Sequence, residues 1–376
     1  MPDKGRFPHF MIKEIFEQPE AVRDTIADNL SSKTKRVELA VTRRIPRDAS
    51  VTFKKITIAA SGTSRHAGIA GRHMIQELAG IPVDVEYASE FEYGNPITGP
   101  EELTIVITQS GETADTLGAQ RLAQARGSRT LAITNVLDST IAREADAVIH
   151  TQAGPEISIA STKAFGAQLV ALYLLAVYLG ETRGTLSDPT VARLVDELLA
   201  LPEKIEVVLQ QNDLCRELAK KYYKIEDFLY IGRSVHYPIA LDGALKLKET
   251  SYIHAEGYPA GEIKHGPYAL IDEHVTVVGI ATRDVNDPQS VLRAEKTIAN
   301  LREVKETGGR VIAVATEGDD EVADAVHHVI TVPKAPELLS PILEIVPLQM
   351  LAYHIAVQRG VDVDRPRNLV KSVTVE

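Results

Sequence analysis

Residues 104–116, Thr-Ile-Val-Ile-Thr-Gln-Ser-Gly-Glu-Thr-Ala-Asp-Thr, hold the pattern that decides the fold. The β-branched run 105–107 predicts a buried strand, Gly111 predicts a tight turn, and the helix formers that begin at Ala114 predict a helix. A strand, a turn and a helix in this order are typical of a parallel α/β sheet.

The same turn is rich in hydroxyl side chains, which are Thr108, Ser110 and Thr113. At a helix N-terminus the free backbone N–H groups point toward one spot, where the helix dipole is positive, so this turn could bind a phosphate group. It lacks the lysine with which a P-loop serves a nucleoside triphosphate. The sequence therefore favours a small phosphorylated metabolite, although hydroxyl residues also cap helices that bind nothing.

A second hydroxyl-rich loop, Ser61-Gly-Thr-Ser64, also follows a strand-like run directly. Two such loops in one parallel sheet can face a common crevice at the carboxyl edge of the strands. No GxGxxG pattern follows Gly62, and no acidic residue ends the next strand as a dinucleotide site requires. The loops thus disfavour a dehydrogenase and predict a phosphate site in the first half of the chain.

The composition excludes several classes of function. A net charge of −11 disfavours nucleic-acid binding, and the single cysteine, Cys215, excludes disulfides and cysteine-rich zinc sites within one chain. The apolar run 169–179 is shorter than a membrane span and predicts a core helix. The N-terminus lacks the apolar region of a signal peptide. We therefore expect a cytoplasmic protein with no membrane partner.

Strand-like runs alternate with helical patterns along all 376 residues, a length that suits about two domains. This alternation predicts mostly parallel sheets with helices on both faces. The predicted strands are 55–60, 83–87, 103–108, 129–134 and 147–150 in one set, and 228–232, 275–280, 309–315 and 328–332 in another.

The two halves resemble each other at a spacing of about 170–180 residues, which predicts a duplicated α/β domain. Segment 129–134 matches 310–315, and 145–150 resembles 325–330. We expect segment 181–213, with its glycine and prolines, to link the halves. The predicted parts are 1–184 (an N-terminal helix and the first domain), 185–360 (the second domain) and 361–376 (a C-terminal tail).

The second half carries different chemistry. On a predicted helix over 240–250, Lys246 and Glu249 are three residues apart and share a face, whereas Lys248 points elsewhere. Such a pair is either a solvated surface ion pair or, since the helix looks largely buried, a proton-transfer base beside a lysine. His265 stands in a Gly/Pro-framed loop, which presents a side chain without burying it, and His254 is expected to be structural.

The C-terminal tail follows the last predicted helix, which Pro366 prevents from continuing. Its apolar residues Leu369, Val370 and Val373 indicate that the tail packs against the protein. Lys371 then lies among apolar neighbours, where its pKa could fall far enough for Schiff-base chemistry. An ordinary tail lysine is the alternative.

Taken together, several long motifs resemble the isomerase domain of the glucosamine-6-phosphate synthase family, also called glutamine–fructose-6-phosphate aminotransferase. This resemblance covers nearly the whole chain and implies two tandem SIS (sugar isomerase) domains, each an α/β, doubly wound, flavodoxin-like sheet. The motifs are Phe10-Met-Ile-Lys-Glu-Ile-Phe-Glu-Gln-Pro19, Ser110-Gly-Glu-Thr-Ala-Asp-Thr116, Ala160-Ser-Thr-Lys-Ala164, the stretch 243–267, Asp364-Arg-Pro-Arg-Asn-Leu369 and Lys371-Ser-Val-Thr-Val-Glu376.

The resemblance also implies roles for single residues. Lys371 would form a Schiff base with the open-chain ketose phosphate, Glu249 would move a proton between C1 and C2, and Lys246 would support that transfer. His265 would assist ring opening from the neighbouring subunit, which implies a homodimer. The implied sugar-phosphate binding positions are Thr63, Ser64, Thr108, Gln109, Ser110, Thr113, and the backbone of Ile159 and Val370.

The implied reaction converts fructose 6-phosphate to glucosamine 6-phosphate with ammonia, and it needs no metal or organic cofactor. Without ammonia, isomerisation to glucose 6-phosphate is expected. The family's N-terminal glutaminase domain has no counterpart here, so we expect an excised domain or a stand-alone protein. Ser61 and Thr108 depart conservatively from the family's usual Cys and Ser.

Two alternatives stay open at this point. One is a stand-alone SIS-type glucosamine-6-phosphate deaminase that uses free ammonia reversibly, since the same residue set fits both directions. The other is a non-catalytic sugar-phosphate sensor, which the absence of an obvious helix-turn-helix segment and the acidic charge disfavour.

Overall fold

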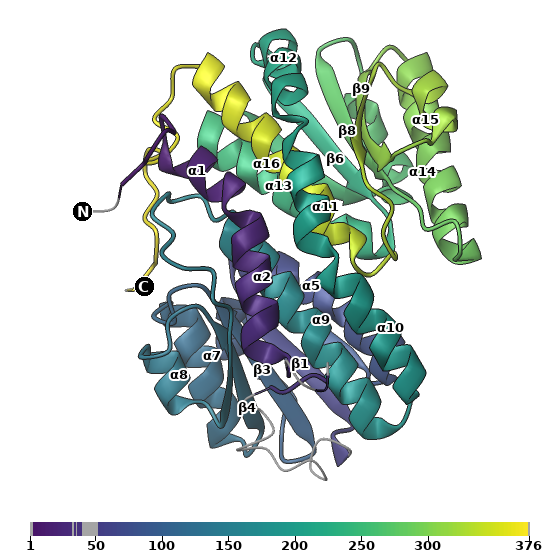
Figure 1. Ribbon diagram of the computed structural model, residues 1–376. Coiled ribbons are helices and arrows are strands. Elements are labelled where there is room, and N and C mark those ends of the chain that lie inside the picture. Colours follow the sequence, from purple (N-terminus) through teal and green to yellow (C-terminus); the bar gives the residue numbers. More distant parts are fainter. Residues whose placement is uncertain (1–2, 32–33, 35, 40–51, 375–376) are drawn as a thin grey trace. The chain divides into compact units, whose positions relative to one another are not determined.

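A computed structural model describes residues 3–31, 34, 36–39 and 52–374 (Figure 1). The chain forms two compact units, each built around one five-stranded sheet. Unit 1 contains the chain up to Glu17, Ile157–Thr162 and Leu201–Leu369, and unit 2 contains Gln18–Glu156, Lys163–Ala200 and the chain from Val370 onward.

These units group residues by contact, whereas the predicted parts 1–184, 185–360 and 361–376 follow the duplication, and those boundaries stay a prediction. Residues 1–2 and 375–376 of the predicted terminal parts lie outside the described residues.

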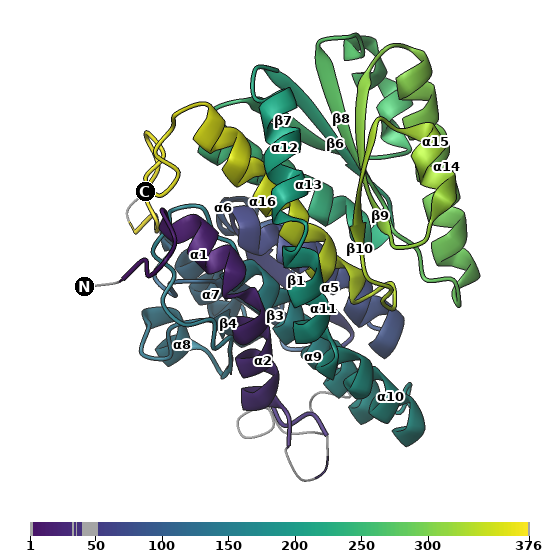
Figure 2. The ribbon, with the colours of Figure 1, turned by 45° about the horizontal axis from the view of Figure 1, so that its top comes forward.

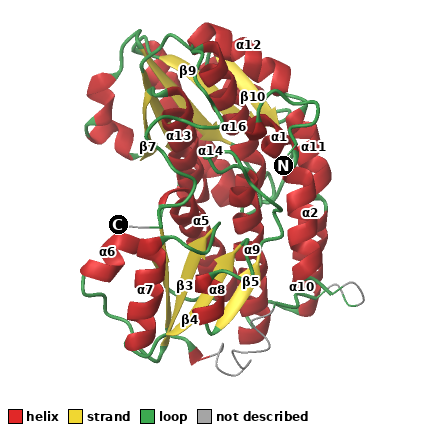
Figure 3. Cartoon of the chain, turned by 90° about the vertical axis from the view of Figure 1, so that its left-hand side faces the viewer, coloured by secondary structure: helices red, strands yellow, loops and turns green. Residues whose placement is uncertain are grey.

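The sheet of unit 2 is parallel throughout, with the strand order β2-β1-β3-β4-β5. Figure 3 shows β3, β4 and β5 side by side. The strands are β1 (Lys55–Ala60), β2 (Val83–Tyr87), β3 (Glu102–Thr108), β4 (Arg129–Thr134) and β5 (Ala147–His150).

Helices cover both faces of this sheet because successive strand residues point to opposite sides. Ala59 and Val106 pack with Ala119 on the face covered by α6, α7 and α8. On the other face, Gly68 of α5 approaches Ile58 so closely that a Cβ there would lie 2.8 Å from its side chain. The helices of unit 2 are α2 (Gln18–Asn29), α5 (Gly62–Ala79), α6 (Ala88–Tyr93), α7 (Ala114–Ala125), α8 (Thr140–Glu144), α9 (Lys163–Arg183) and α10 (Asp188–Leu199).

Unit 1 repeats the plan with the parallel order β10-β9-β8-β6-β7. Numbered from its first strand, each sheet has the order 2-1-3-4-5, which is the flavodoxin-like doubly wound order. The strands are β6 (Asp227–Gly232), β7 (His254–Pro259), β8 (Val275–Ala281), β9 (Arg310–Thr316) and β10 (His328–Val332).

Figure 2 shows α14 and α15 along one face of the second sheet, with α13 and α16 on the other. The helices of unit 1 are α1 (Phe10–Phe16), α11 (Leu201–Leu209), α12 (Asn212–Tyr222), α13 (Tyr237–Ser251), α14 (Pro288–Glu306), α15 (Asp320–Ala325) and α16 (Ser340–Gln358), with the short 3₁₀ turns η1 (Ser234–His236), η2 (Glu262–His265) and η3 (Pro267–Leu270).

The predicted fold class, a duplicated doubly wound α/β sheet, is confirmed. One strand was not predicted, because β7 is an edge strand whose sequence, with Gly257 and Pro259, lacks the β-branched run that marks the others. The expected linker is largely helical. Pro189 lies in the first turn of α10, where proline needs no N–H partner and does not break the helix.

The helices α9 and α16 are long and apolar enough to span a membrane by length and composition, but 94% of each apolar window is buried inside the protein. They are therefore the core helices of their units, as predicted for 169–179. Cys215 is also buried, and burial raises the pKa of its thiol to about 12, which leaves no thiolate for nucleophilic chemistry near neutral pH.

Candidate functional site

The two hydroxyl-rich loops follow β1 and β3, which are neighbours in the sheet. The chain winds in opposite directions from these strands, so this is the switch point at which doubly wound sheets bind ligands. Both turns need glycine, since φ is +52° at Gly62 and +70° at Gly111. A Cβ at Gly111 would lie 2.1 Å from Ser139 Oγ, so no other residue fits there.

Hydrogen bonds inside unit 2 fix the hydroxyl groups of both loops. Thr108 Oγ1 lies 3.0 Å from Thr113 Oγ1 and also accepts a hydrogen bond from the Gly111 N–H at 3.3 Å. The amide of Gln168 on α9 donates to Ser64 Oγ at 3.0 Å. These contacts hold the hydroxyls before any ligand arrives, which lowers the entropy cost of binding.

Helix capping alone does not explain why hydroxyl side chains gather in these two loops. Among the described residues, neither Ser61 at the N-cap of α5 nor Thr113 at the N-cap of α7 makes a side-chain cap bond. The Thr113 hydroxyl bonds to Thr108 instead. The N-terminal turns of both helices thus keep their positive ends at the carboxyl edge of the sheet, as an anion site requires.

The C-terminal tail docks on the second of these loops, within the same unit. Ser372 Oγ lies 2.9 Å from Ser110 Oγ, and the Ala114 N–H at the start of α7 donates to the Val373 carbonyl at 3.0 Å. The prediction that the tail packs is confirmed. In the same tail, the Lys371 Nζ donates to Glu156 Oε2 at 2.6 Å.

Unit 2 therefore holds eight of the predicted site residues. Gln109 follows β3 directly and is partly buried, as is Thr63 in the first turn of α5. Val370 is 64% exposed, and the Lys371 side chain is 25% exposed. The eight are Thr63, Ser64, Thr108, Gln109, Ser110, Thr113, Val370 and Lys371.

Unit 1 holds the other four, which are Ile159, Lys246, Glu249 and His265. On α13 the Lys246 Nζ lies 2.7 Å from Glu249 Oε2, so the predicted pairing along one helix face is confirmed, with Lys248 exposed. The Lys246 side chain is fully buried and that of Glu249 is 22% exposed, so this is no solvated surface pair. A carboxylate that reaches solvent beside a buried ammonium suits a proton-transfer base.

His265 is exposed at the end of η2, and Gly266 behind it has a φ of +138°. The predicted presentation of this side chain without burial is confirmed. Ile159 is partly buried, and its N–H donates to the Asp364 carbonyl at 3.2 Å. The predicted roles of all twelve residues stay predictions.

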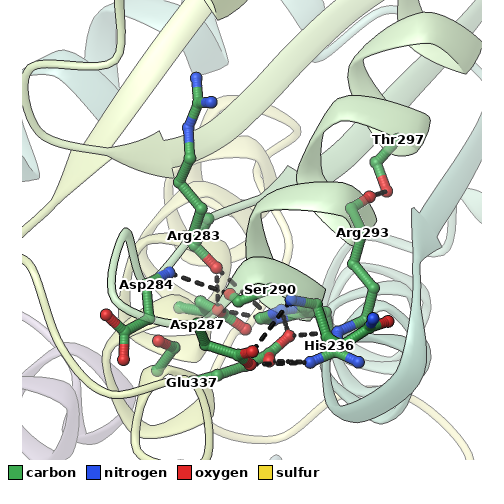
Figure 4. Close-up of polar contacts among 12 residues, drawn as sticks. His236, Arg283, Asp284, Asp287, Ser290, Arg293, Thr297 and Glu337 are labelled. Atoms are coloured by element: carbon green, nitrogen blue, oxygen red, sulfur yellow. Dashed lines mark hydrogen bonds and ion pairs between the residues drawn. The ribbon is translucent and has the colours of Figure 1, made fainter.

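The corresponding edge of the second sheet is built differently. His236 stands four residues after β6, as Ser64 stands four residues after β1. Its ring contacts two carboxylates, with Nδ1 2.8 Å from Glu344 and Nε2 3.1 Å from Glu337. Figure 4 shows Arg293 and His236 both pointing toward Glu337, and the Arg293 Nε donates to it at 2.7 Å.

Interactions between opposite charges set the protonation states of His236 and Glu337 in this cluster. Burial by itself lowers the pKa of His236, but Glu344 and Glu337 together raise it to about 9. Burial by itself raises the pKa of Glu337, but hydrogen bonds from His236 and Arg293 lower it to about 2. The cluster is therefore an imidazolium and a guanidinium that are already paired with carboxylates, so neither cation is left to bind a phosphate at this edge.

Three residues with contacts in unit 2 were not predicted from the sequence, namely Glu156, Gln168 and Ser372. Gln168 lies in α9, whereas Glu156 and Ser372 lie outside any helix or strand. The side-chain partner of each is more than 100 residues away in the sequence. Over the described ranges, no group of three or more His, Cys, Asp or Glu side chains is arranged to hold a metal ion.

A family model for the SIS domain matches residues 52–178 and, a second time, residues 221–359. The chain belongs to the SIS domain family. Each match falls on one of the two sheets, so the predicted duplication is that of two SIS domains, and the resemblance inferred from the motifs is confirmed.

Similarity to known proteins identifies which members of the SIS family this chain resembles. The chain is 50% identical over 374 residues to a glutamine–fructose-6-phosphate aminotransferase (isomerizing) of Chlorobaculum tepidum, a match that spans 100% of this chain and 59% of that protein. A second such enzyme, from Caldanaerobacter subterraneus, is 46% identical over 374 residues, 60% of its length. The chain thus spans about 60% of the length of the curated relatives it matches.

Among solved structures, the C-terminal domain of glucosamine-fructose-6-phosphate aminotransferase from Francisella tularensis superposes with a TM-score of 0.89 at 36% identity, covering 97% of this chain and 100% of that one. This SIS pair therefore corresponds to the C-terminal isomerase domain of those enzymes.

Proposed function

We propose that this chain converts fructose 6-phosphate to glucosamine 6-phosphate, with ammonia as the amine donor, and that it isomerises fructose 6-phosphate to glucose 6-phosphate when ammonia is absent. The observation that carries the proposal is the docked tail. Ser372 contacts Ser110 in the loop after β3, which places the neighbouring Lys371 in the same unit as both hydroxyl-rich loops.

The phosphate of the sugar would bind at the switch point of the unit 2 sheet. The hydroxyls of Ser64, Ser110 and Thr113 offer neutral donors, and the N-terminal turns of α5 and α7 add backbone N–H groups. This combination accepts a phosphate monoester in an acidic protein without a cluster of lysines. Thr63, Thr108, Gln109 and the backbone of Ile159 and Val370 complete the proposed binding set.

The reaction would use four further side chains. Lys371 condenses with the C2 carbonyl of the open-chain ketose, and Glu249 carries a proton between C1 and C2. Lys246, 2.7 Å from Glu249, stabilises negative charge on the enolic intermediate. His265 assists opening of the sugar ring.

We further propose that the protein is a cytoplasmic homodimer in which His265 reaches the site of the neighbouring subunit. Its exposure at the end of η2 is consistent with a role outside its own unit's core. Nucleic acid and membrane are not proposed as partners, given the net charge of −11 and the burial of α9 and α16.

The decisive experiment incubates the purified chain with fructose 6-phosphate, with and without ammonium, and quantifies glucose 6-phosphate and glucosamine 6-phosphate separately. The reverse reaction from glucosamine 6-phosphate is measured in parallel. We expect glucose 6-phosphate without ammonium and an additional amino sugar with it, both abolished in Lys371→Ala. Turnover of neither substrate, despite binding, would instead support the sugar-phosphate sensor.

The reverse assay distinguishes the proposed function from the remaining alternative, a glucosamine-6-phosphate deaminase. A deaminase of Thermotoga maritima that acts on glucosamine 6-phosphate superposes with a TM-score of 0.73, but at 23% identity this likeness shows the fold alone. Release of ammonia from glucosamine 6-phosphate with little forward synthesis at high ammonium would identify the chain as a deaminase and overturn the proposed direction.

A further inference from the structure

The Lys371 ammonium is paired with a carboxylate that no part of the proposed mechanism uses. Glu156 Oε2 lies 2.6 Å from Lys371 Nζ, and the Glu156 side chain is fully buried whereas that of Lys371 is 25% exposed. The pair lies within unit 2, beside the tail contacts that fix Ser372 and Val373. A buried carboxylate that points at the proposed nucleophile is a candidate for a part in its chemistry.

The other oxygen of the same carboxylate holds it in place. Glu156 Oε1 accepts a hydrogen bond from the Ala164 N–H, 3.1 Å away in the first turn of α9. The helix N-terminus favours the negative charge. One oxygen therefore fixes the carboxylate to the scaffold, and the other faces the lysine at a distance over which a proton transfers directly.

An ammonium group cannot attack a carbonyl, so Schiff-base formation requires Lys371 to lose a proton first. We propose that Glu156 is the acid–base partner of Lys371, an inference that rests on the proposed function. Oε2 takes one proton from Nζ, and the neutral amine forms a bond to C2 while the carbonyl π electrons move to oxygen. A proton then moves from the nitrogen to that oxygen, which gives a neutral carbinolamine.

The proton that Glu156 took from Lys371 completes the step. Glu156 returns it to the carbinolamine hydroxyl, which leaves as water, and the nitrogen lone pair forms the C=N bond. The product is a protonated imine that faces the carboxylate, just as the ammonium did. One water is released, no net proton is consumed, and the site begins and ends with one positive and one negative charge.

The test compares the wild type with Glu156→Gln by borohydride trapping of fructose 6-phosphate on the chain, followed by intact mass. The amide keeps an oxygen for the Ala164 N–H but cannot accept the lysine proton. At saturating sugar and neutral pH, we expect the trapping rate of Glu156→Gln to fall about 10²-fold. The rate should recover as the pH rises, because hydroxide replaces Glu156 as the proton acceptor. Glu156→Asp should keep the wild-type shape of the pH profile at a lower rate.

The controls separate this inference from the proposed function. Labelling of the wild type that disappears in Lys371→Ala establishes the Schiff base by itself, and its absence defeats the proposed function rather than the role of Glu156. Glu144→Gln makes the same change in an exposed pair with Arg121 of the same unit and should trap like the wild type. A wild-type rate and pH profile in Glu156→Gln overturns the inference. A trapping rate of Glu156→Gln that is reduced equally at every pH, together with lost sugar binding, also overturns the inference.

Discussion

The hydroxyl of Ser372 lies 2.9 Å from the hydroxyl of Ser110, although 262 residues separate them in the sequence. Ser110 belongs to the turn after β3, and Ser372 directly follows Lys371. One hydrogen bond thus joins the proposed phosphate loop to the residue next to the proposed nucleophile inside a single unit. This contact therefore helps to set where the lysine lies relative to a phosphate bound at the turn.

The first prediction concerns this hydrogen bond. Ser372→Ala removes one neutral hydrogen bond from the tail, worth about 1 kcal/mol, so the rate of Lys371 trapping should fall about fivefold. Lys371 itself is unchanged, so labelling persists at long times. Ser187→Ala, which removes a hydroxyl from the exposed pair with Thr190 in the same unit, serves as the control and should not change trapping. Equal rates for Ser372→Ala and the wild type would show that the tail docks independently of this contact.

A second prediction concerns α13. Glu249→Gln keeps the size of the side chain but removes the base, so turnover should fall about 10²- to 10⁴-fold while fructose 6-phosphate still binds. Binding is measured by calorimetry and turnover by the formation of glucose 6-phosphate. Lys248→Gln alters an exposed position of the same helix and should leave both unchanged. Normal turnover in Glu249→Gln would remove this residue from the mechanism.

Much of the fold could be predicted from the sequence because its central strands are buried on both faces. A run such as 105–107 is apolar at every position and ends in glycine and hydroxyls, so the strand, turn and helix are all marked locally. The same reasoning located the hydroxyl-rich loops and the pairing of Lys246 with Glu249. That pairing depends only on helix geometry, which a spacing of three residues specifies.

What could not be predicted depends on contacts between distant segments. β7 gives no local signal, because an edge strand needs less apolar surface. Glu156 looks like any loop glutamate until the tail brings Lys371 to it, 215 residues further along. His236 gave no functional signal either, since its two carboxylate partners come from segments about 100 residues away. Long-range pairing of this kind leaves no period in the sequence.

The third prediction is a pH dependence of stability. The pKa of His236 in the folded protein is about 9, above the usual 6.5, because two carboxylates face it. The stabilisation that the charged His236 gives to the folded protein is therefore complete below pH 6.5, and it is lost as the pH rises through 9. The difference in unfolding free energy between the wild type and His236→Gln should shrink by up to about 3 kcal/mol across that window.

Denaturant unfolding at a series of pH values measures this difference. His354, whose pKa burial lowers to about 4, titrates in both proteins and cancels. His254→Gln replaces an exposed histidine of the same unit, and its effect should stay within about 0.5 kcal/mol at every pH. A difference for His236→Gln that does not change between pH 6.5 and 9 would mean that His236 is neutral in the folded protein.

The last prediction tests the proposed exchange of His265 between subunits. Lys371→Ala and His265→Asn should each be inactive alone. If His265 acts in the partner's site, a mixed dimer of the two variants has one site with both defects and one site with neither. Random mixing after reversible dissociation should therefore restore about a quarter of the wild-type activity. Because His265 is exposed, His265→Asn should fold normally, which thermal melting checks. Mixtures that stay inactive although mass spectrometry detects mixed dimers would place His265 in the site of its own subunit.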